Sequence, residues 1–390
     1  MKPLAQDFTV IARSPERLTF VMEPGLIKLP SGRLLATFPY LDPRQKNRQL
    51  PDWFNLYVSD DGGASWRRQG SLDLVIGMPF VVEGHLYMLG NRRGRRDIVI
   101  TRSDDEGETW TPLTTLFRGQ YWNCPTGFVI KNGFLYRATG GSQGSGRETL
   151  VIACDLSKDL LDPAAWRISN RLLYPGTPPE LAREGKVRGG HWLEPNVVEV
   201  KGRLYVLSTV KITSESGWTT PGTVAVCSLE DDGVTLDYRF LQYYPTPGGQ
   251  LKFHIIYDEV SGLFWRTMNL PADTSSPPDP RWAAREEIRP VVVTEEGERR
   301  IQANKGGDRR ILALSCSLDA LNWLQAGVIA MTPRPWEGFQ YAVPLVDGDD
   351  LLVISRTSLD GVNQHDANLI TLHRVMDFRS LALDIHPRFE

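Results

Sequence analysis

An eight-residue pattern, Ser-x-Asp-x-Gly-x-x-Trp, occurs twice in this chain of 390 residues, at 59–66 and at 103–110. A shortened copy that lacks the glycine occupies 317–323. Serine and aspartate side chains hydrogen-bond the backbone of a tight turn, and glycine accepts the positive φ that such turns require. The closing tryptophan buries a large ring that holds the turn against the layer beneath it. The pattern therefore predicts repeated strand-to-strand turns in a β protein and assigns its acids a structural role.

A second repeat, made of paired apolar strands around a glycine turn, runs through the whole chain. Each copy has a short polar or proline-containing start, an apolar strand, an x-Gly turn and another apolar strand, as in 78–87 and 194–205. The turn glycines are Gly32, Gly84, Gly133, Gly202, Gly262 and Gly348. Such pairs are typical of β-hairpins, and their spacing of roughly 50 to 85 residues suits a four-stranded blade. We therefore predict an all-β, six-bladed β-propeller that forms one domain over 1–390, has few helices, and is closed by a strand at 369–375.

Composition and charge narrow the class of partner. The chain is 41% hydrophobic and 23% charged, its formal net charge is −3, and no apolar run approaches the ~20 residues of a membrane span. We therefore expect neither nucleic acid nor a membrane as a partner. No apolar leader opens the sequence and the four cysteines lack a CxxC spacing, so we expect a cytoplasmic protein with buried free thiols. The oligomeric state is left open.

The starts of the six inner strands predict a cluster of polar side chains. In a propeller these strands run beside the central channel, so their first residues meet at one mouth of it. The residues at these starts are Glu23, Met78, Asn123, Glu194, Lys252 with His254, and Tyr341. Buried carboxylates without partners are costly, so a ring that holds two of them indicates a functional site. The alternative is that these groups cap strand ends and bind channel water.

The eight-residue repeats resemble the Asp-box, or BNR repeat, of the sialidase superfamily, and the resemblance extends to the Glu-Pro segment at 193–200. It implies a sialidase-like propeller in which Glu194 polarises a tyrosine nucleophile, here Tyr341. A phenol beside a carboxylate is a workable nucleophile because the carboxylate takes its proton, and sialidases depart from two-carboxylate glycoside hydrolysis in this way. The acid of the family would correspond to Asp52 or to Asp42, and the choice between them stays open.

The resemblance fails at the arginines with which sialidases clamp a sugar carboxylate. The family has Arg-Ile-Pro where this chain has Met-Glu-Pro at 22–24, and the strand after Glu194 reads Leu-Ser-Thr-Val at 207–210, without an arginine. Only Arg356 stands where a third arginine could fall. Three arginines serve to bind a carboxylate bidentately, and Glu23 would repel an anion. We therefore predict a glycan substrate other than sialic acid.

Several candidate residues have two interpretations. His191 and Trp192 would place an imidazole and an indole in the pocket wall, or they cover the core. His365, in a polar segment after Arg356, would belong to a loop that binds substrate or a metal, or it would lie in a hydrogen-bonded turn. The predicted catalytic residues are Tyr341, Glu194 and Asp52, and the predicted substrate-binding residues are Glu23, Asn123, His191, Trp192, His254, Arg356 and His365.

Three functions fit these residues, each with an oligosaccharide or polysaccharide as partner. The first is a glycoside hydrolase that uses Tyr341 and Glu194. The second is a polysaccharide lyase on the same scaffold, in which His191 or His254 removes the proton next to a uronate. The third is a non-catalytic glycan-binding propeller, because a fold by itself does not define a function. No phosphate-binding, dinucleotide-binding or zinc motif occurs, so we expect no cofactor and no metal.

Overall fold

The computed structural model describes residues 2–42, 54–94, 96–122, 124–143, 146–181, 185–215, 218, 220–277, 291–294, 297–300 and 307–382. Regular structure in these ranges is almost entirely β-strand, with short 3-10 turns at Pro163–Ala165, Pro179–Leu181 and Phe378–Ala382. No helix within the described ranges is long and apolar enough to cross a membrane. The prediction of an all-β chain with few helices is confirmed.

Most of the described strands can be grouped into six antiparallel sets of four, here called quartets and given from the innermost strand outward. Quartet 1 is β3 (Gly25–Lys28), β4 (Leu34–Leu41), β5 (Phe54–Ser59) and β6 (Arg67–Leu72). Quartet 2 is β7 (Gly77–Val82), β8 (His85–Asn91), β9 (Arg96–Ser103) and β10 (Thr114–Trp122). Quartet 3 is β11 (Val129–Lys131), β12 (Phe134–Gln143), β13 (Gly146–Asp155) and β14 (Trp166–Ile168). Quartet 4 is β16 (Val187–Val200), β17 (Arg203–Ser214), β18 (Thr223–Asp231) and β19 (Leu236–Pro245). Quartet 5 is β20 (His254–Asp258), β21 (Leu263–Leu270), β24 (Ile311–Ser317) and β25 (Leu324–Met331). Quartet 6 is β26 (Gly338–Asp347), β27 (Asp350–Ser358), β28 (Leu369–Val375) and β1 (Thr9–Arg13).

Quartet 6 joins the two ends of the chain. Its outermost strand β1 comes from the N-terminal segment and pairs antiparallel with β28, which is the strand predicted at 369–375. Quartets 2 and 3 are linked in one sheet, because β10 also pairs with β12. The remaining strands are β2 (Phe20–Val21), which pairs with β4, β15 (Leu172–Leu173), which pairs with β13, and the hairpin of β22 (Val291–Thr294) and β23 (Gly297–Arg300).

The x-Gly turns predicted from the sequence connect the first two strands of the quartets. In quartets 2, 3 and 4 both residues of the turn have positive φ, for example 50° at Asn132 and 77° at Gly133. Two positive φ values define the type I′ turn, whose twist matches that of the flanking strands. The hairpin predictions are confirmed at these positions.

The eight-residue repeats form side-chain-locked turns. In the first copy, Asp61 Oδ1 accepts the backbone N–H of Ser65 at 2.9 Å, and the indole N–H of Trp66 donates to the carbonyl of Gly63 at 3.1 Å. The copy at 103–110 repeats both bonds, at 2.8 and 3.0 Å. Both turns connect the third and fourth strands of a quartet, away from the innermost strands. The acids of the repeat therefore hold outer hairpins, as the sequence predicted.

Replacing Asp61 or Asp105 by alanine is expected to lower the melting temperature without changing turnover of any substrate. Hydrogen bonds from the hydroxyl and the N–H of residue i+4 lower the pKa of both carboxyls from 3.8 to about 2. Because the folded pKa lies below the ordinary value, this stabilisation is present above about pH 4 and is lost as the pH falls towards about 2. Melting followed by circular dichroism at neutral and acid pH measures the effect. Asp349→Ala is the control, because this acid is exposed and its ion pair with Arg379 is long, at 3.4 Å. An equal loss of melting temperature there would contradict the assignment.

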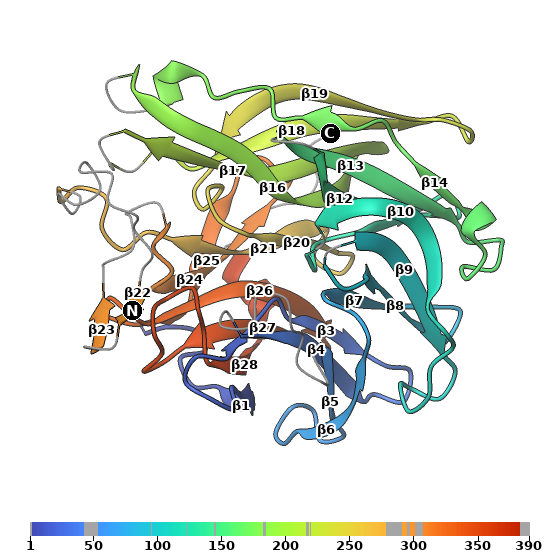
Figure 1. Ribbon diagram of the computed structural model, residues 1–390, viewed down its shortest axis with the longest axis horizontal. Helices are drawn as coiled ribbons and strands as arrows, with labels where there is room; N and C mark the ends of the chain where they lie inside the picture. Colours follow the sequence, from blue (N-terminus) through green and yellow to red (C-terminus); the bar gives the residue numbers. More distant parts are fainter. Residues whose placement is uncertain are drawn as a thin grey trace.

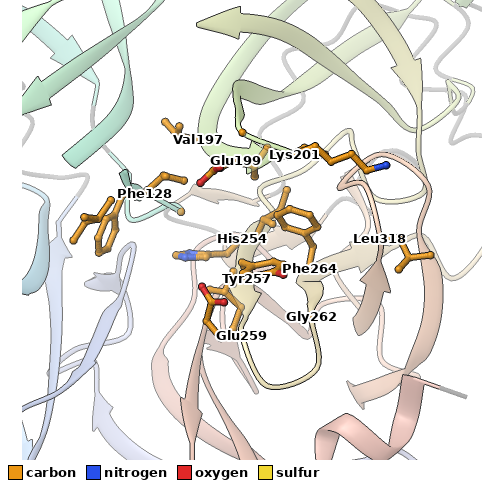
Figure 2. Close-up of a pocket in the computed structure, with 18 residues that line it drawn as sticks. Phe128, Val197, Glu199, Lys201, His254, Tyr257, Glu259, Gly262, Phe264 and Leu318 are labelled. Atoms are coloured by element: carbon orange, nitrogen blue, oxygen red, sulfur yellow. The ribbon is translucent and has the colours of Figure 1, made fainter. Parts of the chain in front are cut away.

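The innermost strands lie side by side at the centre of the molecule (Figure 1). Strand β3 contacts both β7 and β26, β20 contacts both β16 and β26, and β11 contacts β16. At the hairpin-turn end of β11, β16 and β20 lies a cavity of about 660 Å³ (Figure 2), here called the turn-end pocket. Its lining includes Phe128, Glu199, His254, Tyr257 and Glu259. The pocket extends along β20 as far as its first residue, His254, but its lining includes neither Glu194 nor Tyr341.

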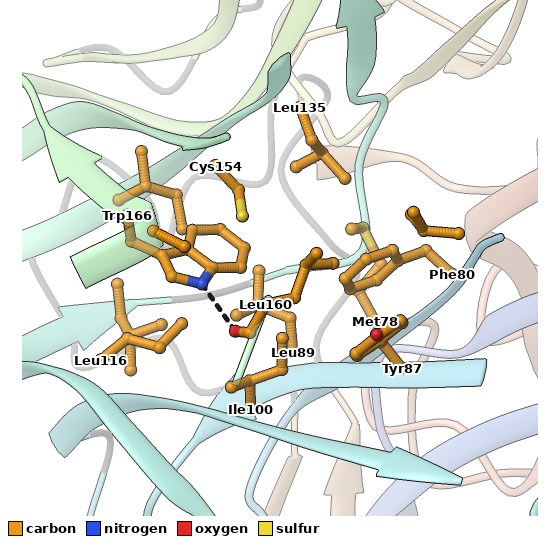
Figure 3. Packing of buried hydrophobic residues seen from close by; sticks show 14 of the residues in the cluster. Met78, Phe80, Tyr87, Leu89, Ile100, Leu116, Leu135, Cys154, Leu160 and Trp166 are labelled. Carbon is orange, nitrogen blue, oxygen red and sulfur yellow. Dashed lines mark hydrogen bonds between the residues drawn. The ribbon is translucent and has the colours of Figure 1, made fainter. Parts of the chain in front are cut away.

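The apolar core is divided among clusters, several of which fill the space between neighbouring quartets. Figure 3 shows the cluster between quartets 2 and 3, whose members include Phe80, Leu135 and Trp166. The indole N–H of Trp166 donates to the carbonyl of Leu160 at 2.8 Å (Figure 3). Full burial of one such large apolar side chain stabilises the fold by about 1.5–3 kcal/mol. The four cysteines, Cys124, Cys154, Cys227 and Cys316, are buried free thiols, as predicted.

Candidate functional site

Two β-bulges position the predicted catalytic pair. The pairing of β16 with β17 shifts register around Glu194, and the pairing of β26 with β27 shifts register around Tyr341. Both residues have positive φ, 53° for Glu194 and 52° for Tyr341. Residues with side chains adopt this conformation rarely, and it clusters at functional sites. A bulge also releases a side chain from the strict alternation of a strand, so both residues can face one space.

Glu194 and Tyr341 are joined by a hydrogen bond between their side chains. Glu194 is 5% exposed, and its burial raises the pKa of the carboxyl, whereas the bond from the Tyr341 hydroxyl acts in the opposite direction. Burial and the charge of Glu194 raise the pKa of Tyr341 well above its usual value, so the phenol is protonated at rest. The pair thus combines a phenol with a carboxylate placed to take its proton.

Two more residues from the predicted strand starts, Glu23 and Lys252, lie beside this pair. Both are buried, and Lys252 Nζ donates to the carbonyl of Ala342 at 2.7 Å. Burial lowers the pKa of Lys252 to about 8, and the nearby groups, including Glu194 and Glu23, oppose that shift. Glu23 Oε2 is buried without a hydrogen-bond partner in the described part of the chain. The structure therefore brings together four of the side chains that strand-start convergence predicted.

Arg356 supplies a buried cation against the nucleophile candidate. Its guanidinium carbon lies 5.2 Å from the ring centroid of Tyr341, and its Nη2 donates to the carbonyl of His365 at 2.5 Å. The side chain is 0% exposed, yet Nε and Nη1 find no hydrogen-bond partner among the described residues. Buried donors without partners are costly. Among the described residues, Arg356 thus keeps two unpaired donors in the neighbourhood of Tyr341.

Two further cations, Arg309 and Lys211, were missed by sequence reasoning. Arg309 precedes β24, and its charge interacts with Tyr341 and Glu194, while burial lowers its pKa. Lys211 is a cross-strand neighbour of His191 on β17, and burial together with Arg309 lowers its pKa. One signal was available, because Lys211 directly follows the segment 207–210 in which a second arginine was sought. Nothing in the local sequence singles out Arg309.

His365 lies at the edge of this group. Its ring centroid is 6.4 Å from that of Tyr341, and its Nδ1 is 2.7 Å from Asp366 Oδ1. Burial and Arg356 lower the pKa of His365 to about 4, so the imidazole is neutral near pH 7. Asn363 Oδ1 accepts the backbone N–H of His365 at 2.7 Å. The two interpretations of this residue are therefore compatible: it lies in a hydrogen-bonded turn and also beside the candidate site.

Trp192 requires a correction. It is 0% exposed, its indole N–H donates to the carbonyl of Arg147 at 3.1 Å, and its ring packs in the core cluster between quartets 3 and 4. The rings of Tyr174 and Phe240 pack against the indole, with centroids 5.9 and 6.3 Å from it, so the core-packing interpretation holds. The neighbouring His191 is half-buried, and burial with Arg147 and Lys211 lowers its pKa to about 4.

Of the other predicted residues, one lines the turn-end pocket, one is buried, and two lie outside the described ranges. His254 lines the turn-end pocket, although Lys252, two residues earlier, lies beside Glu194. Asp42 is buried, at 2% exposure. Asp52 and Asn123 lie outside the described residues. Within the described ranges no group of three or more His, Cys, Asp and Glu side chains is placed to hold a metal ion.

Solved structures match the fold of this chain, at sequence identities near 15%. No family model and no curated protein matches the chain. An α-L-arabinanase of Penicillium chrysogenum, solved with arabinobiose, superposes with a TM-score of 0.56 at 14% identity, over 97% of this chain and 99% of that one. Trypanosoma rangeli sialidase, solved with the inhibitor DANA, superposes with a TM-score of 0.56 at 15% identity, over 93% of this chain and 56% of that one. The Hadza microbial sialidase Hz136 gives a TM-score of 0.53 at 15% identity, over 92% of this chain and 66% of that one. The chain thus spans only part of the sialidases' length, and its fold is the sialidase-like propeller fold that arabinanases share.

Proposed function

We propose that the six quartets are the six blades of one propeller domain and that the protein hydrolyses a glycosidic bond in a glycan other than sialic acid. The observation that carries this proposal is the hydrogen-bonded pair of Glu194 and Tyr341, held by two bulges with positive φ. The likeness to arabinanases and sialidases supports the architecture alone, since the identities are near 15%. The locked turns at 59–66 and 103–110, which resemble Asp-boxes, belong to this architecture and not to the reaction.

In the proposed reaction the hydroxyl oxygen of Tyr341 attacks the anomeric carbon while Glu194 takes the phenolic proton. The bond from that carbon to the leaving oxygen breaks, and the leaving oxygen receives a proton from an acid that we assign to Asp52 or Asp42. Water then attacks the anomeric carbon and gives a proton to the aspartate. The bond to Tyr341 breaks, and Glu194 returns the proton to the phenolic oxygen. The cations near Tyr341 stabilise the negative charge that develops on its oxygen.

The substrate class follows from the mixture of charges around the pair. A sugar hydroxyl can both donate to the unpartnered oxygen of Glu23 and accept from the unpartnered donors of Arg356. The carboxylate of a sialic acid would instead be repelled by Glu23 if it lay near that side chain. We therefore propose that Glu23 and Arg356 bind substrate hydroxyls, with His191 and His365 at the edges of the site.

A turnover screen of the purified protein tests this function. Aryl glycosides, including arabinosides and sialosides, and plant and algal oligosaccharides are incubated with the protein, and both new reducing ends and unsaturated products are followed. We expect new reducing ends from a glycoside that carries no sialic acid. Unsaturated products would replace the hydrolase by a lyase, and binding without turnover would indicate a sugar-binding propeller. Hydrolysis of sialosides alone would contradict the substrate class.

A further inference from the structure

The turn-end pocket takes no part in the proposed reaction and is built as a binding site in its own right (Figure 2). Its volume, about 660 Å³, lies within the range of roughly 300–1,000 Å³ that is usual for small-molecule sites. Its walls come from β11, β16 and β20 and from the hairpin turns that follow β16 and β20. Its lining includes neither Glu194 nor Tyr341. A ligand in the pocket would therefore be distinct from the one at Tyr341.

His254 gives this pocket an unused hydrogen-bond acceptor. The side chain is 7% exposed, the carbonyl of Pro125 hydrogen-bonds the ring, and Nδ1 has no partner in the described part of the chain. A neutral imidazole that donates through one nitrogen accepts through the other. Burial and Lys252 hold the pKa of His254 well below its usual value, so the ring is neutral near pH 7. A donor from a ligand would satisfy Nδ1.

Two aromatic rings stand at the same pocket with part of their surface open. Phe128 is 37% exposed and Tyr257 is 49% exposed, and Figure 2 shows His254 between them. Tyr257 is supported from behind by Phe264, with ring centroids 5.0 Å apart. The face of an aromatic ring is negative, so it attracts the slightly positive C–H bonds of a flat, partly apolar ligand.

The charged groups around the pocket favour a neutral ligand with several hydrogen-bond donors. The carboxylates of Glu199 and Glu259 stand near His254, whereas Lys201 extends away from it (Figure 2). Glu199 already pairs with Lys131 at 3.4 Å, and the charge of Lys252 acts on the imidazole of His254. Two positive charges therefore already act on the groups that an organic cation in the pocket would contact. A metal ion is not favoured either, because the described acids and imidazoles form no cluster that could hold one.

We propose that the turn-end pocket binds one neutral sugar residue, whose ring packs on Phe128 and Tyr257 and whose hydroxyls donate to His254 Nδ1 and to the carboxylates at the mouth. Sugars combine the two features that the pocket selects, a C–H face and a set of hydroxyl donors. The site is preformed, because Asn196 ties its three strands together: Oδ1 accepts the N–H groups of Gly127 and Ile255 at 3.0 and 3.2 Å. Preformed walls reduce the ordering that binding costs.

The imidazole NMR resonances offer a direct test. The chain has only six histidines, so the signals of His254 can be distinguished from the others. The full-length Tyr341→Phe protein is used, so that chemistry at the other site does not contribute, and it is labelled with ¹⁵N-histidine. A second sample that also carries His254→Gln identifies the resonances of His254. The probes are methyl α-L-arabinofuranoside, methyl β-D-glucopyranoside and methyl β-D-galactopyranoside, with benzyl alcohol and cyclohexylamine as non-sugar comparisons. We expect one of the glycosides to shift the His254 Nδ1 resonance in a saturable way.

Variants at the rim separate sugar stacking from a general apolar cavity. Tyr257→Ala, at a half-exposed position, is expected to weaken the glycoside by at least about tenfold, and Val234→Ala, an exposed change elsewhere, is expected to have no effect. A response to benzyl alcohol or cyclohexylamine without a response to any glycoside would overturn the proposal. So would the absence of any response, or equal affinity in Tyr257→Ala. These outcomes are independent of the turnover screen, so failure of either proposal leaves the other standing.

Discussion

Replacing Tyr341 by phenylalanine is expected to lower kcat on the best glycoside of the screen by at least about a thousandfold, because the attacking oxygen is removed. Glu194→Gln is expected to lower kcat by about a hundredfold or more, since an amide cannot take the phenolic proton. Both substitutions keep the size of the side chain, so the melting temperature should stay close to that of the wild type. Initial rates at saturating glycoside measure the loss, and thermal melts confirm the fold.

The matched controls change the same residue types away from the pair. Tyr205→Phe on β17 and Glu230→Gln on β18 should retain wild-type turnover. A mechanism-based fluoro-sugar should also label the wild-type protein on the peptide that contains Tyr341, and mass spectrometry detects the added mass. Turnover that survives in both Tyr341→Phe and Glu194→Gln would refute the assignment of the pair while keeping the enzyme.

The pH profile provides a second readout of the same pair. Burial raises the pKa of Glu194 above its ordinary value of 4.5. The carboxylate form is the one that accepts a proton, so kcat/KM should rise with pH through this raised pKa and fall towards acid. That acid limb should disappear in Glu194→Gln. A residual acid limb of unchanged position would assign it to another group.

Replacing Asn196 by alanine is expected to destabilise the fold by about 3 kcal/mol, because it leaves several buried backbone groups unpaired at once. The side chain is 0% exposed, and its Oδ1 accepts two backbone N–H groups, from Gly127 and Ile255. Its Nδ2 donates to the carbonyls of Glu194 and Phe253, each at 3.3 Å. Asn196 therefore connects three innermost segments of the structure with one amide. Urea denaturation of wild type and variant measures the difference.

Asn170→Ala is the matched control for this prediction. Asn170 also makes two bonds to backbone groups, both to Tyr238, but it is itself exposed, so water can replace much of what is lost. Asn170→Ala should lower the free energy of unfolding by about 1 kcal/mol. An equal cost for the two variants would show that Asn196 is not a special connection. Because the Glu194 carbonyl is one of its partners, Asn196→Ala should also slow turnover beyond the effect of stability.

The sequence alone determined the features that depend on neighbouring residues. The locked turns at 59–66 and 103–110 rest on side chains that bond to backbone within four residues, and the x-Gly hairpins rest on the φ preferences of two adjacent residues. Both patterns are local, so they were predicted correctly. Strand-start convergence then predicted that Glu194 and Tyr341 belong to one region, because the hairpin repeat gives each strand the same direction.

Only the tertiary structure decided which side chains meet. Arg309 lies near Tyr341 although no local pattern marks it, and Trp192 belongs to the core although it stands two residues before Glu194. The register shifts that free Glu194 and Tyr341 from strand alternation come from pairing with β17 and β27, which a one-dimensional pattern does not contain. Hydrogen bonds within a turn are set by a few residues, whereas contacts between strands from distant parts of the chain depend on packing of all the sheets together. That difference explains why the fold could be predicted from the sequence, whereas the full set of side chains that meet in the site could not.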